Sequence, residues 1–167
     1  MSTEIEKKYL LPAFPEALLQ AQELKLISTK HIYQTYLAFS DKEEIRVRQL
    51  VDHEGNSTFT HTFKSGHGLV RQEIEYSISE EVYRQLLANT QLVPLEKIRT
   101  TVEHNGLHYE IDEYKQINLL VVEVEFSNES AAHSFEPPAW FGRELGQEEE
   151  FRNKSLWIGL QTQNVRV

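Results

Sequence analysis

The chain has no cysteine and a single methionine, and it has only seven glycines and five prolines in 167 residues. The lack of cysteine excludes disulfides, thiolate metal sites and cysteine nucleophiles, and it favours a reducing compartment. No apolar run approaches the length that crosses a bilayer, and a typical one covers only residues 119–122. The first eleven residues also lack the apolar core of a secretion signal, because charged residues begin at Glu4. We therefore expect a cytoplasmic protein with no membrane partner.

Positive charge is also scarce. Lysine and arginine together number 17 against 26 aspartates and glutamates, so the formal net charge is -9 and the isoelectric point is about 5.3. This balance argues against long nucleic acids as partners, because their binding depends on clustered positive charge. The length fits one domain better than two. Since no repeat or linker divides the sequence, we expect a single domain over residues 1–167.

Hydrophobic and polar residues alternate with period two over many short segments, which is the pattern of half-buried strands. Eight strands are predicted, over residues 4–10, 31–39, 43–51, 57–64, 70–78, 95–103, 107–114 and 119–126. Helical patterns cover residues 15–27, 80–87 after an N-cap at Ser79, a short stretch from 127 or 128 through 132, and 153–160. The predicted fold class is α+β, mostly antiparallel sheet with a few short helices.

Like charges recur two residues apart in five of these strands, and residues at this spacing share one face of a strand. The pairs are Glu4 and Glu6, Arg46 and Arg48, Glu73 and Glu75, Lys97 and Arg99, and Glu123 and Glu125. An amphipathic strand commonly turns its charged face to solvent, but neighbouring like charges repel unless counter-ions lie between them. A closed or strongly curved sheet with this face inside would relieve the repulsion. A polyanion would lie on the basic strands, and hard cations such as Mg²⁺ or Mn²⁺ would bridge it to the carboxylates.

The order of these motifs resembles that of the CYTH domain, whose members are also called triphosphate tunnel metalloenzymes. The chain opens with E-x-E-x-K, ending at Lys8, and continues with R-x-R, Lys64, R-x-E-x-E from Arg71, K-x-R, Asp112 and E-x-E. The resemblance runs from residue 4 to about residue 156. The family includes inorganic triphosphatases, thiamine triphosphatases, a class of adenylate cyclases and RNA 5′-triphosphatases. It implies an eight-stranded antiparallel β-barrel with the charged side chains inside and short helices packed outside.

The resemblance also implies roles for the charged residues. Glu6 and Glu125 would bind a first metal ion. Glu4 and Glu123 would bind a second ion that activates water, with Asp112 as a further candidate ligand. The side chains implied to bind the triphosphate are Lys8, Arg46, Arg48, Lys64, Arg71, Lys97 and Arg99, with Glu73 and Glu75 lining the tunnel among them. The implied reaction is hydrolysis of the terminal phosphoanhydride of a small triphosphate, with Mg²⁺ or Mn²⁺ as cofactor.

The C-terminal part departs from the family pattern. Where the family has Y-x-N-x-x-L, the chain has Phe151 in place of tyrosine and keeps Asn153 and Leu156. Lys154 in this motif is a candidate for an additional phosphate ligand. Glu110 shares the phase of Asp112, but its place near the start of its strand favours a position facing solvent.

Several functions stay open at this point. An adenylate cyclase, a thiamine triphosphatase, or a module that binds polyphosphate or a nucleotide without turnover would carry the same motifs. A small-ligand carrier barrel of the lipocalin type is disfavoured, because its inward-facing residues should be apolar. The sequence predicts no oligomeric state.

Overall fold

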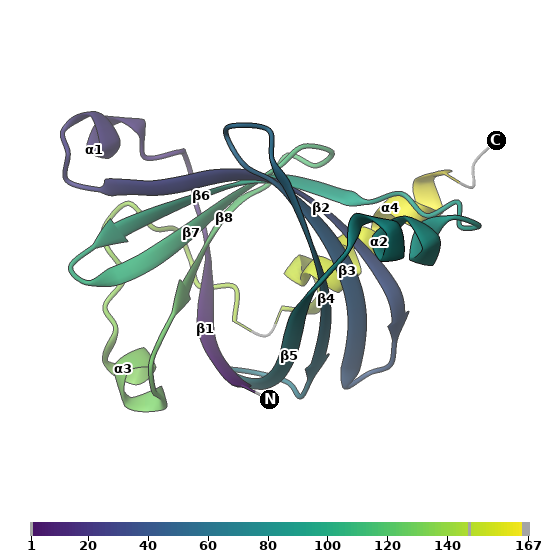
Figure 1. Ribbon diagram of the computed structural model, residues 1–167. Helices are drawn as coiled ribbons and strands as arrows, with labels where there is room; N and C mark the ends of the chain where they lie inside the picture. Colours follow the sequence, from purple (N-terminus) through teal and green to yellow (C-terminus); the bar gives the residue numbers. More distant parts are fainter. Residues whose placement is uncertain (1, 147, 165–167) are drawn as a thin grey trace.

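In the computed structural model, which describes residues 2–146 and 148–164, eight antiparallel strands form a closed barrel (Figure 1). Around the barrel the strands follow the order β1-β5-β4-β3-β2-β6-β7-β8. Their bounds are β1 Ser2–Leu10, β2 Lys25–Phe39, β3 Glu43–Val51, β4 Ser57–Ser65, β5 Val70–Ile78, β6 Leu95–His104, β7 Leu107–Tyr114 and β8 Leu120–Glu125. The helices are α1 Glu16–Gln20, α2 Glu80–Leu87, α3 Glu129–Ser134 and α4 Asn153–Asn164, with a 3-10 turn, η1 Glu149–Phe151, before α4. The predicted α+β class and its eight antiparallel strands are confirmed.

The N-terminal strand closes the barrel. β1 pairs with β5, where Glu4 lies opposite Arg71, and with β8, where Glu6 lies opposite Glu125. The E-x-E-x-K motif is therefore in register with the R-x-E-x-E motif on one side and with the E-x-E motif on the other. Motifs that are far apart in the sequence meet at this closure.

A two-residue hairpin joins β6 to β7. His104 pairs with Leu107 across the turn, and the intervening Asn105 and Gly106 have φ angles of 51° and 77°. Positive φ at both central residues is the geometry of a type I′ turn, for which Asn-Gly is a preferred sequence. This turn fixes the register that places Arg99 directly opposite Asp112.

The prediction of a helix over residues 15–27 is wrong in its second half. α1 ends at Gln20, and β2 begins at Lys25 rather than at residue 31. Gln22 has a positive φ of 59°, which ends the helix. Residues 25–30 then pair with β6, from Lys25 opposite Glu103 to Lys30 opposite Arg99. Pairing with a distant strand thus overrides a local helical pattern in this stretch.

The outer face of the barrel carries apolar side chains, which α1, α2 and the segments after β8 cover in part. Tyr9 and Tyr109 pack against Phe141, with ring centroids 5.1 Å and 5.4 Å apart. Phe126 and Phe135 extend the same buried cluster. Much of this outer face is buried beneath helix and loop, and the charged side chains of the strands line the interior.

Helix α4 occupies one end of the barrel, and it is seen behind β3 and β4 in Figure 1. Its Trp157 and Leu160 pack against inward-facing apolar residues of the strands, including Tyr36 and Leu95. The expectation that all helices pack outside therefore needs correction for α4. The interior is apolar at this end and charged beyond it. At 12 residues, α4 is the longest helix of the described chain, and none of the described helices has the length and apolar character needed to span a membrane.

Candidate active site

The inward-facing charged side chains surround a cavity of about 330 Å³ to which each of the eight strands contributes. A stretch that we call the C-terminal segment, residues 142–146 and 148–154, supplies further lining residues. Of the predicted site residues, those that line the cavity are Glu4, Glu6, Lys8, Arg46, Arg48, Lys64, Arg71, Glu73, Glu75, Lys97, Arg99, Glu123, Glu125 and Lys154. Asp112 does not line it. The structure therefore brings together side chains from one end of the sequence to the other.

The register of the strands shows how most of the like-charge repulsion is relieved. Lys8 on β1 lies opposite Glu123 on β8, and Lys64 on β4 lies opposite Glu73 on β5. The ion-pair distances are 3.8 Å from Lys8 Nζ to Glu123 and 3.1 Å from Lys64 Nζ to Glu73. Pairs of like charge along one strand are thus neutralised by opposite charges on the next strand.

Asp112 anchors two of the basic side chains. It is fully buried, and one oxygen lies 2.6 Å from Lys97 Nζ while the other accepts from Arg99 Nε at 2.7 Å. Arg99 also donates to Glu110, which lines the cavity instead of facing solvent as expected. Burial alone would raise the pKa of Asp112, but the charges of Arg99 and Lys97 outweigh burial and lower it. Both carboxylate oxygens are occupied, so the observed role of Asp112 is to hold cations in place.

Lys97 is similarly constrained. Its side chain is almost fully buried, and burial together with the nearby Arg99 lowers the pKa of Lys97 to about 8. Asp112 opposes this shift, and the ring of Tyr114 lies 5.7 Å from Lys97 Nζ. Lys97 and Arg99 form a preorganised pair of hydrogen-bond donors beside the cavity.

Lys64 is held by two carboxylates. Its Nζ lies 2.9 Å and 2.6 Å from the two oxygens of Glu4, in addition to its contact with Glu73. Arg48 is held in the same way by Glu75, at 2.8 Å. Lys64 and Arg48 thus each have an acidic partner that orients them toward the cavity.

Glu6 and Glu125 lie directly opposite each other, and among the described residues neither makes an ion pair. Burial, followed by the neighbouring Glu123 and Glu4, raises the pKa of Glu6 to about 8. Burial and the negative charges of Glu4 and Glu110 also raise the pKa of Glu125. Within the described part of the chain, the pair therefore forms no ion pair with a basic side chain, in contrast to Glu4 and Glu123.

This uncompensated pair fits the requirements of a hard divalent cation, which prefers carboxylate oxygens. Within residues 2–146 and 148–164, no three histidine, aspartate or glutamate side chains stand close enough together to form a metal site as they are. Both oxygens of Glu4 are occupied by Lys64. The residues present nevertheless fit such an ion, because Glu4, Glu6, Glu123 and Glu125 all line one cavity.

Sequence patterns missed some residues of the cavity. Glu44 lies two residues before Arg46 and shares its inward face, so the period-two pattern contained the signal. Tyr36 lies opposite Arg46 and lines the cavity, but an aromatic residue in an alternating strand reads as core. Arg152 lies between η1 and α4, where no periodic pattern applies.

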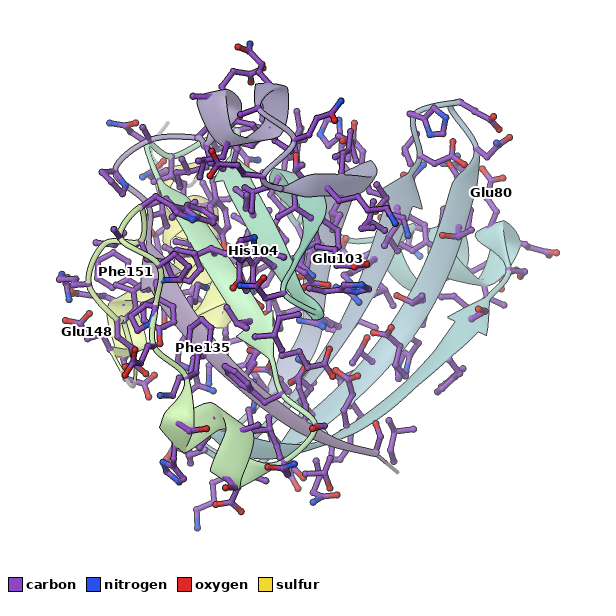
Figure 2. All side chains as sticks on the ribbon, turned by 90° about the vertical axis from the view of Figure 1, so that its left-hand side faces the viewer. Glu80, Glu103, His104, Phe135, Glu148 and Phe151 are labelled. Carbon is purple, nitrogen blue, oxygen red and sulfur yellow. The ribbon has the colours of Figure 1, made fainter. Side chains whose placement is uncertain are left out.

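The C-terminal segment is fastened to β1 and closes one side of the site. Leu145 N donates to Lys8 O at 2.8 Å, and Gly142 N donates to Leu10 O at 2.7 Å. Figure 2 shows two of its cavity-lining residues, Glu148 and Phe151, on the opposite flank of the barrel from Glu80. Lys154 lies at the edge of the cavity, where its Nζ donates to the carbonyl of Ser40 at 3.2 Å.

The chain forms a closed eight-stranded barrel with cations and carboxylates interleaved on its inner face. Such an interior is suited to enclosing a polyanion. The chain belongs to the CYTH domain family, whose model matches residues 2–155. It is 36% identical over 162 residues to an inorganic triphosphatase of Nitrosomonas europaea, covering 95% of this chain and 99% of the relative. It is 29% identical over 160 residues to an inorganic triphosphatase of Acetivibrio thermocellus, covering 93% and 94%.

Solved structures agree with this assignment. A crystal structure of an inorganic triphosphatase is 33% identical with a TM-score of 0.63, covering 95% of this chain and 96% of that one. A protein of Pyrococcus horikoshii has the same TM-score of 0.63 at 17% identity, covering 96% and 99%, and shows the shared fold alone.

Proposed function

We propose that the protein hydrolyses the terminal phosphoanhydride of a small triphosphate, with inorganic triphosphate as the substrate and the cytoplasm as its compartment. The observation that carries this proposal is the facing pair of Glu6 and Glu125 beside a cavity lined by lysine and arginine. The names of both relatives and of one solved structure support it. The absence of cysteine supports the compartment.

Family membership implies a divalent metal cofactor. Glu6 and Glu125 would hold one ion, and Glu4 with Glu123 a second, because these carboxylates supply the oxygen ligands that Mg²⁺ and Mn²⁺ prefer. When bound, such an ion neutralises phosphoryl oxygens and makes water a stronger nucleophile. We exclude Asp112 from this set, because Lys97 and Arg99 occupy both of its oxygens.

The basic side chains bind and orient the triphosphate. Arg46, Arg48 and Arg99 offer planar donors that suit phosphate oxygens, while Lys8, Lys64 and Lys97 add compact charges. Arg99 and Lys97 are fixed before substrate arrives, so their donors stabilise transition-state charge without reorganisation. Lys64 releases Glu4 when it turns to a phosphate oxygen. The chemistry is phosphoryl transfer to water, which requires positioning and electrostatics and no covalent nucleophile.

Release of phosphate from tripolyphosphate tests this proposal, with Mg²⁺, Mn²⁺ or EDTA present. We expect hydrolysis with either ion and none with EDTA. Glu6→Gln and Glu125→Gln should each abolish activity while the protein stays folded by circular dichroism. Glu129→Gln, on the exposed surface of α3, is the matched control and should keep full activity. Hydrolysis that survives EDTA, or full activity in either cavity variant, would contradict the proposal.

A further inference from the structure

The strands β3, β4 and β5 turn almost all of their charged side chains into the cavity. Of the lysine, arginine, aspartate and glutamate residues in these strands, every one lines the cavity except Glu43, the first residue of β3. Because successive side chains of a strand point to opposite faces, the outer face of the three strands is uncharged beyond Glu43. The chain as a whole has 26% charged residues. Since few charges and exposed aromatic residues are typical of the centre of a protein interface, this face is a candidate contact surface.

The strand register aligns the outer side chains into two rows across this face. Phe63 on β4 lies opposite Ile45 on β3 and opposite Ile74 on β5. In the next row His61 lies opposite Tyr76, and the centres of their rings are 5.1 Å apart. Ile74 and Tyr76 are 41% and 52% exposed. The two rows form a continuous apolar and aromatic surface, and we call these five residues the outer patch.

Helix α2, which follows β5 in Figure 1, covers only one end of this face. Its Tyr83 packs on Phe59 of β4 with ring centroids 4.9 Å apart, and Val47 is fully buried in the same cluster. Within residues 2–146 and 148–164, no residue of the outer patch belongs to a buried apolar cluster. α2 itself adds Val82 and Leu86, which are exposed and lie one helical turn apart. Sheet and helix thus present apolar surface that no other segment of the described chain covers.

We propose that two copies of this chain form a symmetric dimer through the outer patch and the adjoining flank of α2. This inference does not depend on the proposed function. In a dimer with two-fold symmetry the same surface of both copies meets itself, so a charge there would lie near a like charge. The uncharged outer patch avoids this repulsion. Its polar groups are also self-complementary, because the His61 imidazole and the Tyr76 hydroxyl can each donate and accept hydrogen bonds.

Charge and size both favour a second copy as the occupant. Because the net charge is -9, contact through most other faces would bring negative charges together. A nucleic acid or an anionic membrane requires clustered lysine and arginine, which the outer patch lacks. Three strands about 4.8 Å apart, with about seven residues each at a rise of about 3.3 Å, present roughly 300 Å² of flat area. A contact of this size is at the lower end of specific interfaces, so we expect dissociation in the micromolar range.

Analytical ultracentrifugation from about 1 µM to about 300 µM protein tests the dimer. The mass of the wild type should rise from 19.5 kDa toward twice that value over this range. Tyr76→Glu should raise the dissociation constant at least about a hundredfold, because two like charges would face each other in the interface. Leu26→Glu is the matched control, because Leu26 is 56% exposed on β2 outside the outer patch, and this variant should dimerise like wild type. A wild type that stays at 19.5 kDa, or equal behaviour of the two variants, would overturn the proposal.

Ile74→Ser keeps the test valid if a buried charge disturbs the fold. This variant removes apolar area without adding charge, and it should raise the dissociation constant about tenfold. Because Ile74 is already exposed in the single chain, the circular dichroism spectrum and the urea midpoint should match wild type at concentrations where both are monomeric. Unchanged dimerisation of Ile74→Ser would contradict the proposal.

A mixture of Tyr76→Glu and Tyr76→Lys separates a dimer through this patch from other modes of association. Each variant alone should be monomeric, whereas the mixture should form a dimer, because opposite charges then face each other across the two-fold axis. A mixture that remains monomeric would place the contact elsewhere and overturn the proposal. Vesicles of phosphatidylcholine test the other occupant of an uncharged patch. If the wild type is monomeric and sediments with these vesicles, the patch binds lipid and the dimer is excluded.

Discussion

Lys8 Nζ donates a hydrogen bond of 3.0 Å to the backbone carbonyl of Phe151. Lys8 also accepts a backbone hydrogen bond from Leu145, and its Nζ lies 3.8 Å from Glu123. A single lysine of the first strand thus joins β8, the C-terminal segment and the cavity. The position of that segment therefore bears directly on the site, and the first prediction concerns it.

Gly142→Ala should displace the C-terminal segment from β1. A Cβ atom at this position would lie 2.7 Å from Leu10 O, the carbonyl that accepts the hydrogen bond of Gly142 N. Since the obstacle is backbone, it cannot turn aside, and we expect a loss of about 1 to 3 kcal/mol in the free energy of unfolding. Urea denaturation measures this loss, and phosphate release from tripolyphosphate should fall with it.

Gly159→Ala is the control for this change. Gly159 lies inside α4, and a Cβ there would meet no atom of the described residues within 4 Å. Alanine is favoured over glycine in a helix interior, so the variant should gain up to about 1 kcal/mol. Equal stability of both variants would argue against the close contact at Leu10.

Asp112→Asn should destabilise the fold whether or not metal is present. The variant leaves Lys97 and Arg99 buried without their counter-ion, and breaking a buried ion pair costs about 3 to 5 kcal/mol. Urea denaturation in EDTA measures this loss. Glu113→Gln on the same strand, with a side chain 54% exposed, should change stability by less than about 0.5 kcal/mol. If Asp112→Asn is as stable as wild type in EDTA, Asp112 does not anchor Lys97 and Arg99.

The contribution of Asp112 to the free energy of unfolding should depend on pH. The pKa of Asp112 is lower in the folded chain than its ordinary value of 3.8, so the unfolded chain binds this proton more tightly. Its contribution to stability is therefore complete above about pH 4 and is lost as the pH falls below that value. The difference in unfolding free energy between wild type and Asp112→Asn should shrink over this range. A difference that stays constant down to pH 2 would contradict the lowered pKa.

The hydrogen bond from the Tyr114 hydroxyl to Asn153 should couple β7 to the start of α4. Tyr114→Phe and Asn153→Ala should each cost about 1 kcal/mol, the usual net value of such a bond. The double variant should cost less than the sum, because both single changes remove one interaction. Strict additivity in a denaturation cycle would show that the two groups act independently.

The inner charged face was predictable because period-two alternation assigns side chains to faces before any pairing is known. Arg46 and Arg48 show this well, since both face the cavity as expected. Glu44 follows the same rule, although it stands outside the like-charge pairs. In contrast, Leu26 reads as helix because its strand partner, Val102, lies 76 residues away in the sequence.

The ion-pair partner of each charged side chain could not be predicted in the same way. Alternation places Asp112 and Glu110 on the inner face, but it does not say which cation will occupy their oxygens. The registers of β6 with β7 and of β7 with β8 decide this, and they depend on turn geometry and on closure of the whole barrel. Arg152 lies in irregular backbone, where its place in the site follows from how α4 and η1 pack.

Closure of the barrel has a consequence for synthesis of the chain. β1 needs β8 as a partner, and β8 begins 110 residues after the end of β1. Until translation has passed that point, the nascent chain has an open strand edge and half of the carboxylate pair. The charges of Glu4 and Glu6 protect such an edge from pairing with other chains, because charged edges disfavour association. A ribosome-bound fragment that stops before β8 should therefore form neither the closed barrel nor the active site.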